Sequence, residues 1–216
     1  MLRKVYYTAW QLENIANDLL KRYAPETIDV EPVPTPIERM IEIDCGLYMC
    51  YMNLSKRGKT PLGKTCFDDG YTRVYNRQKK KMEYIKVDRG TIIIEADLLH
   101  GNPGRLRFSQ CHEFSHWTTQ KEIYTGTNIQ PAFRKQEPDP EEKWLEWQAD
   151  EISRNLLLPM KTVRPYFNIL KNKRGLSDFD IITEIAGKYI VSKQTAGIQL
   201  HEHKLIKMDR RSLYLN

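Results

Sequence analysis

Hydrophobic residues recur at helical spacing in the first part of the chain. Over residues 8–23, apolar side chains repeat every three or four positions among charged ones, which predicts an amphipathic helix with Thr8 as its N-cap. Prolines then punctuate residues 31–36. A short helix is expected to follow them, with Thr35 as its cap and Pro36 in its first position. The chain is therefore expected to begin with two helices.

From residue 46 to residue 96 the pattern changes to short runs of strand-forming residues, separated by glycines and by Asp-Gly or Arg-Gly pairs. The runs cover residues 47–52, 65–67, 71–75, 82–87 and 91–96. Such short strands with turns between them are typical of an antiparallel meander. We therefore expect this segment to supply the sheet of the protein.

Helix start signals mark two longer helices in the second half of the chain. An Asn-Pro pair at 102–103 begins the first, which is expected to extend to about residue 118. A polar, proline-containing loop is expected at 135–138. An Asp-Pro pair at 139–140 then begins the second helix, which ends before Pro159.

The last part of the chain predicts a helix, a short turn capped by Ser192 and a second helix. Lys193 and Gln194 at the start of the second helix are a thin basis for reading DNA bases. We therefore favour a packing subdomain over a DNA-binding one. The expected division is a main domain of residues 1–172 and a helical, helix-turn-helix-like subdomain of residues 173–216.

Composition places the chain among ordinary globular proteins. Its 216 residues suffice for one domain, or for a main domain with a small second one, and 40% of them are hydrophobic and 29% charged. The apolar runs are too short to span a bilayer, and the N-terminus lacks the apolar stretch of a secretory signal. We therefore expect a cytoplasmic protein without a membrane partner.

Charge and cysteine content add little chemistry of their own. The formal net charge is +6, and basic residues cluster at 77–81 and 171–174. Such runs are more often solvated loops than nucleic-acid contacts, so we favour solvation. The cysteines lack the paired spacing of a zinc site and are expected to be ordinary buried thiols. They are Cys45, Cys50, Cys66 and Cys111.

Residues 112–116 read His-Glu-Phe-Ser-His, which is an H-E-x-x-H motif. On a helix, His112 and His116 project from the same face, and both can bind one zinc ion. The intervening Glu113 then points at the open coordination position of the metal. A catalytic zinc site of this kind needs one further protein ligand.

The second long helix offers that ligand. A buried apolar stripe is predicted along it at Leu145, Ala149, Ile152 and Leu156. Glu146 and Asp150 lie beside the stripe, where carboxylates are costly unless a cation meets them. We expect Glu146 to complete a zinc site with His112 and His116, and Asp150 to accept the other N–H of a ligand histidine. The alternative readings are satisfied core histidines and a solvated acidic face, and they require separate coincidences at both helices.

Other segments accompany the motif. A strand-like run at 91–99 and residues 104–108 precede it, and the helix after it carries Glu-x-x-Ala-Asp at 146–150 and Leu-Leu-Leu-Pro at 156–159. Together with residues 112–116, these segments resemble the ImmA/IrrE family of zinc metallo-endopeptidases. Three departures from the family pattern occur in the second helix. Asp150 stands where the family usually has Asn, Gln148 where Glu is frequent, and Ile152 where Phe is usual.

The resemblance implies an α+β, zincin-like fold. A small antiparallel or mixed sheet would pack on the motif-bearing helix and on the second ligand helix, followed by the helix-turn-helix-like part. It also implies a zinc-dependent, site-specific endopeptidase that cleaves a regulatory protein, such as a helix-turn-helix repressor of a mobile element or stress response. His112, His116 and Glu146 would be the zinc ligands, and Glu113 the catalytic acid and base.

Two further expectations concern the substrate. A second group that stabilises the oxyanion is expected, with Tyr124 and His100 as candidates, and the sheet edge near 82–96 is expected to hold substrate as an added strand. The competing function is a DNA-binding or protein-binding regulator with a structural or vestigial zinc site. DNA is the more weakly supported partner. Glu113 favours catalysis, because a structural site has no use for a carboxylate that binds no metal beside an open position.

Overall fold

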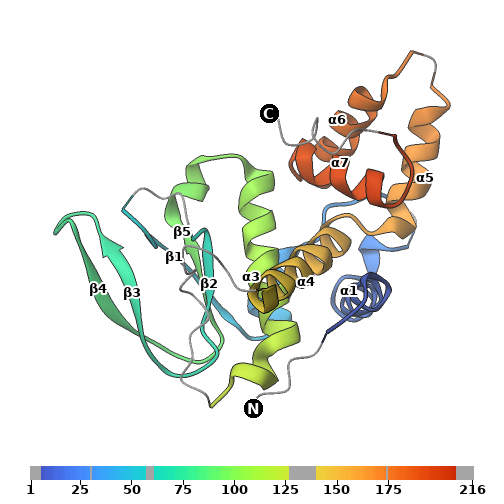
Figure 1. Ribbon diagram of the computed structural model, residues 1–216. Coiled ribbons are helices and arrows are strands. Elements are labelled where there is room, and N and C mark those ends of the chain that lie inside the picture. The colour runs from blue at the N-terminus through green and yellow to red at the C-terminus, as the bar shows by residue number, and fades with distance from the viewer. Residues whose placement is uncertain (1–5, 30, 57–60, 127–139, 174, 208–216) are drawn as a thin grey trace.

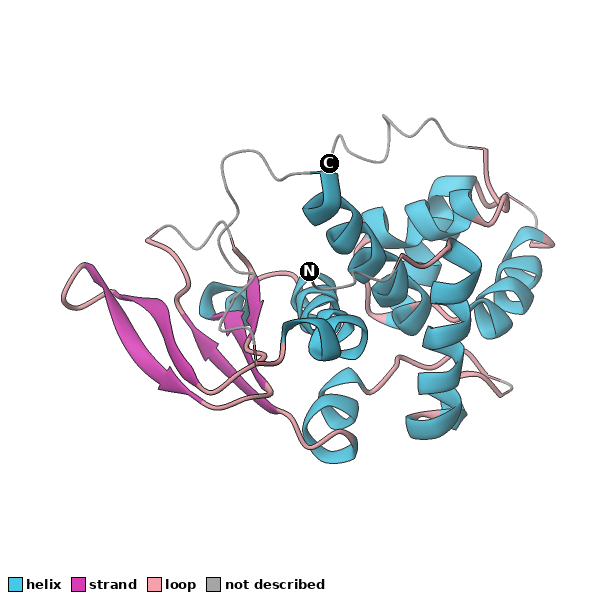
Figure 2. Cartoon of the chain, turned by 60° about the horizontal axis from the view of Figure 1, so that its bottom comes forward, coloured by secondary structure: helices cyan, strands magenta, loops and turns pink. Residues whose placement is uncertain are grey.

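The computed structural model describes residues 6–29, 31–56, 61–126, 140–173 and 175–207. The fold is α+β, as the sequence predicts, with the strands on one side and most of the helices on the other (Figure 1, Figure 2). The helices are α1 (Ala9–Tyr23), α2 (Ile37–Arg39), α3 (Pro103–Tyr124), α4 (Pro140–Leu157), α5 (Met160–Lys171), α6 (Asp178–Tyr189) and α7 (Lys193–Glu202). The strands are β1 (Tyr48–Met52), β2 (Gly63–Thr65), β3 (Gly70–Asn76), β4 (Lys81–Val87) and β5 (Thr91–Glu95).

The five strands lie near the expected positions, but the prediction that they form one antiparallel meander is wrong. β5 is the centre of a mixed sheet, parallel to β1 on one side and antiparallel to β2 on the other. β3 and β4 form a separate antiparallel hairpin. All of β5 is buried, and a strand that is apolar at successive positions suits the middle of a sheet covered on both faces. Since β5 has neighbours on both sides, it cannot accept an added strand, so the expectation for the edge near 82–96 is wrong for β5. β4 pairs only with β3 among the described residues, and for β4 the expectation stays a prediction.

Three of the predicted helix caps are present. Thr8, Asn102 and Ser192 each accept hydrogen bonds from N–H groups in the first turn of α1, α3 and α7, respectively. The Asp139 cap and the loop at 135–138 lie outside the described residues. α4 ends before Pro159, as predicted. No helix in the described ranges is long and apolar enough to cross a membrane.

Two predictions about helix boundaries differ from the structure. Thr35 does not cap the short helix, because its hydroxyl donates to the carbonyl oxygen of Leu156 on α4 at 2.6 Å, and Pro36 takes the N-cap position. α3 extends beyond residue 118 because its last turn is buried by tertiary packing. There Ile123 and Tyr124 join a small apolar cluster that no local sequence signal reports.

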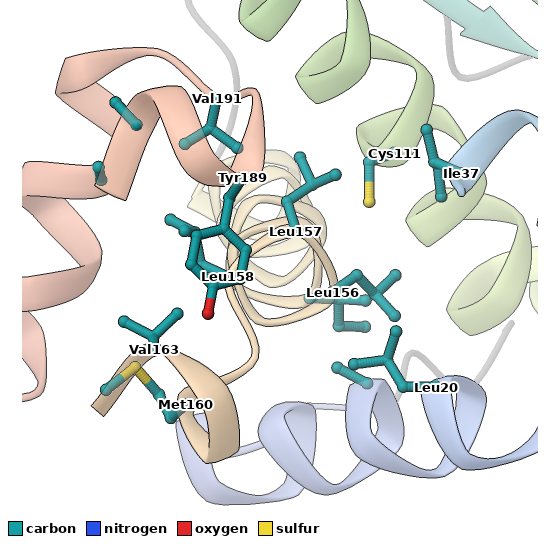
Figure 3. Close-up of a cluster of buried hydrophobic side chains, with 14 of the residues drawn as sticks. Leu20, Ile37, Cys111, Leu156, Leu157, Leu158, Met160, Val163, Tyr189 and Val191 are labelled. Atoms are coloured by element: carbon teal, nitrogen blue, oxygen red, sulfur yellow. The ribbon is translucent and has the colours of Figure 1, made fainter. Parts of the chain in front are cut away.

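One buried hydrophobic cluster connects the N-terminal helices with the C-terminal ones. Figure 3 shows its centre, where the end of α4 and the residue after it contribute Leu156, Leu157 and Leu158. The surrounding labelled side chains are Leu20, Ile37, Cys111, Met160, Val163, Tyr189 and Val191. Helices α5–α7 therefore share the core of the preceding part. The division of the chain after residue 172 stays a prediction.

The start of α3 packs tightly against the turn between α6 and α7. A Cβ added to Gly104 would lie 2.4 Å from the carbonyl carbon of Val191 and 2.5 Å from the nitrogen of Ser192. Arg107, one turn further along α3, donates from Nε to the carbonyl oxygen of Ile190 at 3.1 Å. The C-terminal helix pair is thus held by the same helix that carries the H-E-x-x-H motif.

Replacing Gly104 with alanine should destabilise the fold by about 1–3 kcal/mol, because two backbones must separate to admit the methyl group. Gly187 of α6 is the matched control, since a Cβ there meets nothing within 4 Å. Gly187→Ala should be neutral or stabilising by up to about 1 kcal/mol. Chemical denaturation measures both, and equal stability of the two variants would contradict the close approach.

Candidate metal centre

Helices α3 and α4 cross so that two histidines face two carboxylates. His112 Nε2 lies 3.4 Å from Glu146 Oε2, and His116 Nε2 lies 3.5 Å from Glu146 Oε1. The two Nε2 atoms are 2.9 Å apart. His112, His116 and Glu146 are the group of metal-ligating type found among the described residues, with donor atoms all within 4.8 Å of one another. The structure therefore brings together three side chains from two helices that can hold one ion.

The donor separations suit a tetrahedral ion. Zinc binds nitrogen and oxygen ligands at about 2.0–2.2 Å, so neighbouring donors in a tetrahedral site are roughly 3.3 Å apart. Each carboxylate oxygen of Glu146 lies near that spacing from one histidine nitrogen, Oε2 from His112 at 3.4 Å and Oε1 from His116 at 3.5 Å, and the histidine nitrogens are slightly nearer to each other. Two imidazoles and one carboxylate leave the fourth position for a non-protein ligand.

The other nitrogen of each imidazole has a partner that orients the ring. His112 Nδ1 is 2.8 Å from Asp150 Oδ1, and His116 Nδ1 is 2.8 Å from the side-chain amide of Gln120. Both Nε2 atoms face the common site. The contact between His112 and Asp150 is the arrangement that orients metal-binding histidines, whereas Gln120 presents its amide nitrogen, an N–H donor, to His116. Sequence reasoning missed Gln120. Its position one turn after His116 on the same helix was the available signal.

The two imidazoles differ in their affinity for a proton. Burial disfavours the charged form of His112, but hydrogen bonds to Asp150 and Glu146 outweigh burial and raise its pKa to about 10. Burial, reinforced by the charge on His112, lowers the pKa of His116 to about 4. At neutral pH without a metal, the pair therefore carries one positive charge.

The Glu113 side chain contacts β2. Its side chain is buried, and the Thr65 hydroxyl lies 2.8 Å from its Oε2 and 2.9 Å from its backbone carbonyl oxygen. A Cβ added to Gly63 would lie 2.4 Å from Glu113 Cγ. Strand β2 thus holds the Glu113 side chain in two ways, by the close approach of Gly63 and by the hydrogen bond from the Thr65 hydroxyl. Sequence reasoning missed both Gly63 and Thr65.

A cavity of about 320 Å³ opens over these groups. Its wall includes the three candidate ligands, Glu113 and the residues of β2. Tyr124 also lines it, whereas His100 is exposed and is not among the lining residues. Lys64 is a buried cation in the wall, where burial lowers its pKa and its ammonium group donates to the Thr72 hydroxyl. The cavity places the candidate metal position, a carboxylate and a cation beside space for a ligand.

The group contains no cysteine. Cys66 and Cys111 are buried and Cys45 and Cys50 half-buried, and all four are free thiols. Burial raises the pKa of the Cys66 thiol to about 11 and that of Cys111 to about 12. They behave as buried thiols rather than as metal ligands.

The chain matches no model of a known protein family, and no curated protein sequence matches it.

Zinc binding should release about one proton at neutral pH, because the ion must displace the proton held on His112, whose pKa is raised to about 10. His116, with a pKa of about 4, should contribute none. Affinity should therefore rise about tenfold per pH unit between pH 6 and 8. Titration calorimetry in two buffers with different ionisation enthalpies counts the protons. An affinity independent of pH would contradict this account.

Proposed function

We propose that the protein is a zinc-dependent endopeptidase. The observation that carries the proposal is the position of Glu113, a buried carboxylate that stands beside the His112–His116–Glu146 group without belonging to it, on the wall of the cavity. A site that only holds a metal for stability is closed by protein ligands, whereas a hydrolytic site keeps a position open and places a base next to it. The H-E-x-x-H spacing and the resemblance to ImmA/IrrE peptidases support the same function.

Peptide hydrolysis needs a group that moves a proton twice. When bound, zinc supplies Lewis-acid chemistry that acidifies water and polarises a carbonyl oxygen. Glu113 accepts the proton of the water that attacks the peptide carbonyl. It then gives that proton to the nitrogen as the C–N bond breaks, so that the products are a carboxylic acid and an amine. Gly63 and Thr65 hold the Glu113 carboxyl group in place for both transfers.

An extended substrate fits the edge of the sheet beside Glu113. In the described part of the chain, β2 pairs with β5 on one side, and no strand pairs with its other side. Leu62 and Cys66, which flank β2, form main-chain hydrogen bonds with β5. Successive residues of a strand direct their N–H and C=O groups to opposite sides, so those of Gly63 and Thr65 face the open side. A substrate strand added there would lie along the cavity wall. Tyr124 is the remaining candidate for stabilising the oxyanion, since it lines the same cavity.

The substrate that we propose is a regulatory protein, specifically a helix-turn-helix repressor, in keeping with the resemblance. The competing function, a DNA-binding regulator with a structural zinc site, would use α7 to read bases. Half of α7 is buried, and only Lys193, Gln194 and Glu202 are exposed. A recognition helix needs a free face that reaches into the major groove, so this packing favours the peptidase.

Glu113→Gln should retain zinc and lose cleavage by a factor of about 10² to 10⁴, because the amide cannot take up a proton. The assay incubates each protein with the repressor encoded next to it, with and without a chelator, and mass spectrometry measures zinc in parallel. Glu146→Ala is the companion variant and should lose both zinc and cleavage. Full cleavage by Glu113→Gln would rule out the mechanism.

Gly63→Ala should lower cleavage while leaving zinc bound, because the new methyl group displaces Glu113 but not the three ligands. Gly70→Ala in β3 is the matched control, since a Cβ there meets nothing within 4 Å. Cleavage rates and zinc content distinguish the two variants. If both retain the wild-type rate, the contact between β2 and Glu113 has no part in catalysis.

A further inference from the structure

One face of the β3–β4 hairpin carries aromatic and cationic side chains that neither the core nor the metal centre uses. We define the hairpin face as Tyr71, Arg73, Tyr75, Met82, Tyr84 and Lys86, which alternate along the two strands. Tyr71 is 67% exposed and Tyr84 70%. Figure 1 shows the hairpin at the left of the molecule, away from helices α5–α7. None of the six residues lines the cavity.

The opposite face of the hairpin explains why these six side chains point outward. Val74 and Val87 are buried in a cluster with Cys66, which follows β2, and with Ile93 of β5. The inner face of the hairpin therefore covers the mixed sheet. Exposed tyrosines are therefore not a consequence of the packing of this hairpin. The valines pack the hairpin against the mixed sheet, so the side chains of the outer face are available to bind a ligand.

Cross-strand register places a cation opposite each exposed ring. Arg73 pairs with Tyr84, with its guanidinium carbon 5.9 Å from the ring centre, and Tyr71 pairs with Lys86. Glu83, the acidic residue of β4, belongs to the inner set and is bonded to Asn76 and Lys79. Among the side chains of these two strands, the hairpin face therefore has cations and aromatic rings without a carboxylate.

The basic cluster at 77–81 forms the tip of the same hairpin. Arg77 is paired with Asp97, and Lys79 with Glu83. Lys80 and Lys81 are exposed, and Lys81 lies 3.9 Å from Glu83. The tip thus extends the positive charge of the hairpin face beyond its last ring.

We propose that the hairpin face binds single-stranded nucleic acid, with bases stacked on Tyr71 and Tyr84 and phosphates held by Arg73 and Lys86. Stacking on aromatic side chains combined with a cationic track is the chemistry by which proteins bind single strands without reading sequence. Tyr71 and Tyr84 are diagonal neighbours, roughly 7–8 Å apart in such a ladder, which suits two unstacked bases. Seven residues of strand span roughly 23 Å, enough for a few nucleotides.

Other ligands use this face less well. A duplex keeps its bases stacked inside, so the two rings would have no partner. An acidic peptide would meet the cations but offers no flat rings to the tyrosines. The combination of exposed rings with cations directly opposite them therefore favours single-stranded nucleic acid, and the binding does not depend on peptidase activity.

The test measures fluorescence anisotropy of a labelled oligothymidylate of about 15 nucleotides with the full-length, zinc-loaded protein. Tyr71→Ala and Tyr84→Ala should each weaken binding at least about fivefold, whereas Tyr84→Phe should bind like the wild type. Arg73→Ala should reduce the slope of log affinity against log salt by about 0.7, the contribution of one phosphate contact on a single strand.

Tyr48→Ala is the matched control, since Tyr48 is 65% exposed on β1 and lies outside the hairpin face. It should leave the affinity unchanged, and thermal melting confirms that each variant is folded. Unchanged binding by both alanine variants of the hairpin face would overturn the proposal. Equal competition by duplex DNA or by polyglutamate would also overturn it, because the surface would then recognise charge alone.

Discussion

Two carboxylates on α4 face two histidines on α3, and the candidate site depends on this contact between the helices. Asp150 orients His112, and Glu146 approaches the Nε2 atoms of both histidines. Removing the histidines from water is costly unless opposite charge compensates the proton they carry, and the partly exposed carboxylates supply that charge only when the helices cross correctly. A bound cation would strengthen this arrangement further, which explains why so many ionisable groups gather beside an apolar core.

The surrounding fold fixes the position of α3 at two places. Near its start, Gly104 allows the α6–α7 turn to approach, and near its middle Gly63 allows β2 to approach Glu113. Both contacts require the absence of a Cβ. The C-terminal helices thus contribute to the site by positioning the helix that carries it, and half of α7 is buried in doing so. The hairpin face lies apart from these contacts, so a nucleic acid could occupy it without disturbing the cavity.

Local signals in the sequence predict most of the helices and the three candidate ligands. A four-residue spacing places His112 and His116 on one side of a helix whatever the rest of the chain does. Strand order depends instead on which segments meet in space, and only the unbroken run of isoleucines in β5 pointed to a central strand. Thr65 reaches Glu113 across 48 residues of chain, and no local pattern reports such a contact. The groups that hold Glu113 therefore became visible only in three dimensions.

X-ray absorption at the zinc edge of the purified, zinc-loaded protein tests the central claim most directly. A site made by His112, His116 and Glu146 predicts two imidazole nitrogens, a carboxylate oxygen and one further light atom at about 2.0–2.2 Å. Sulfur at about 2.3 Å would place the metal on cysteines, and a spectrum unchanged in Glu146→Ala would remove α4 from the site. Either result would contradict the account.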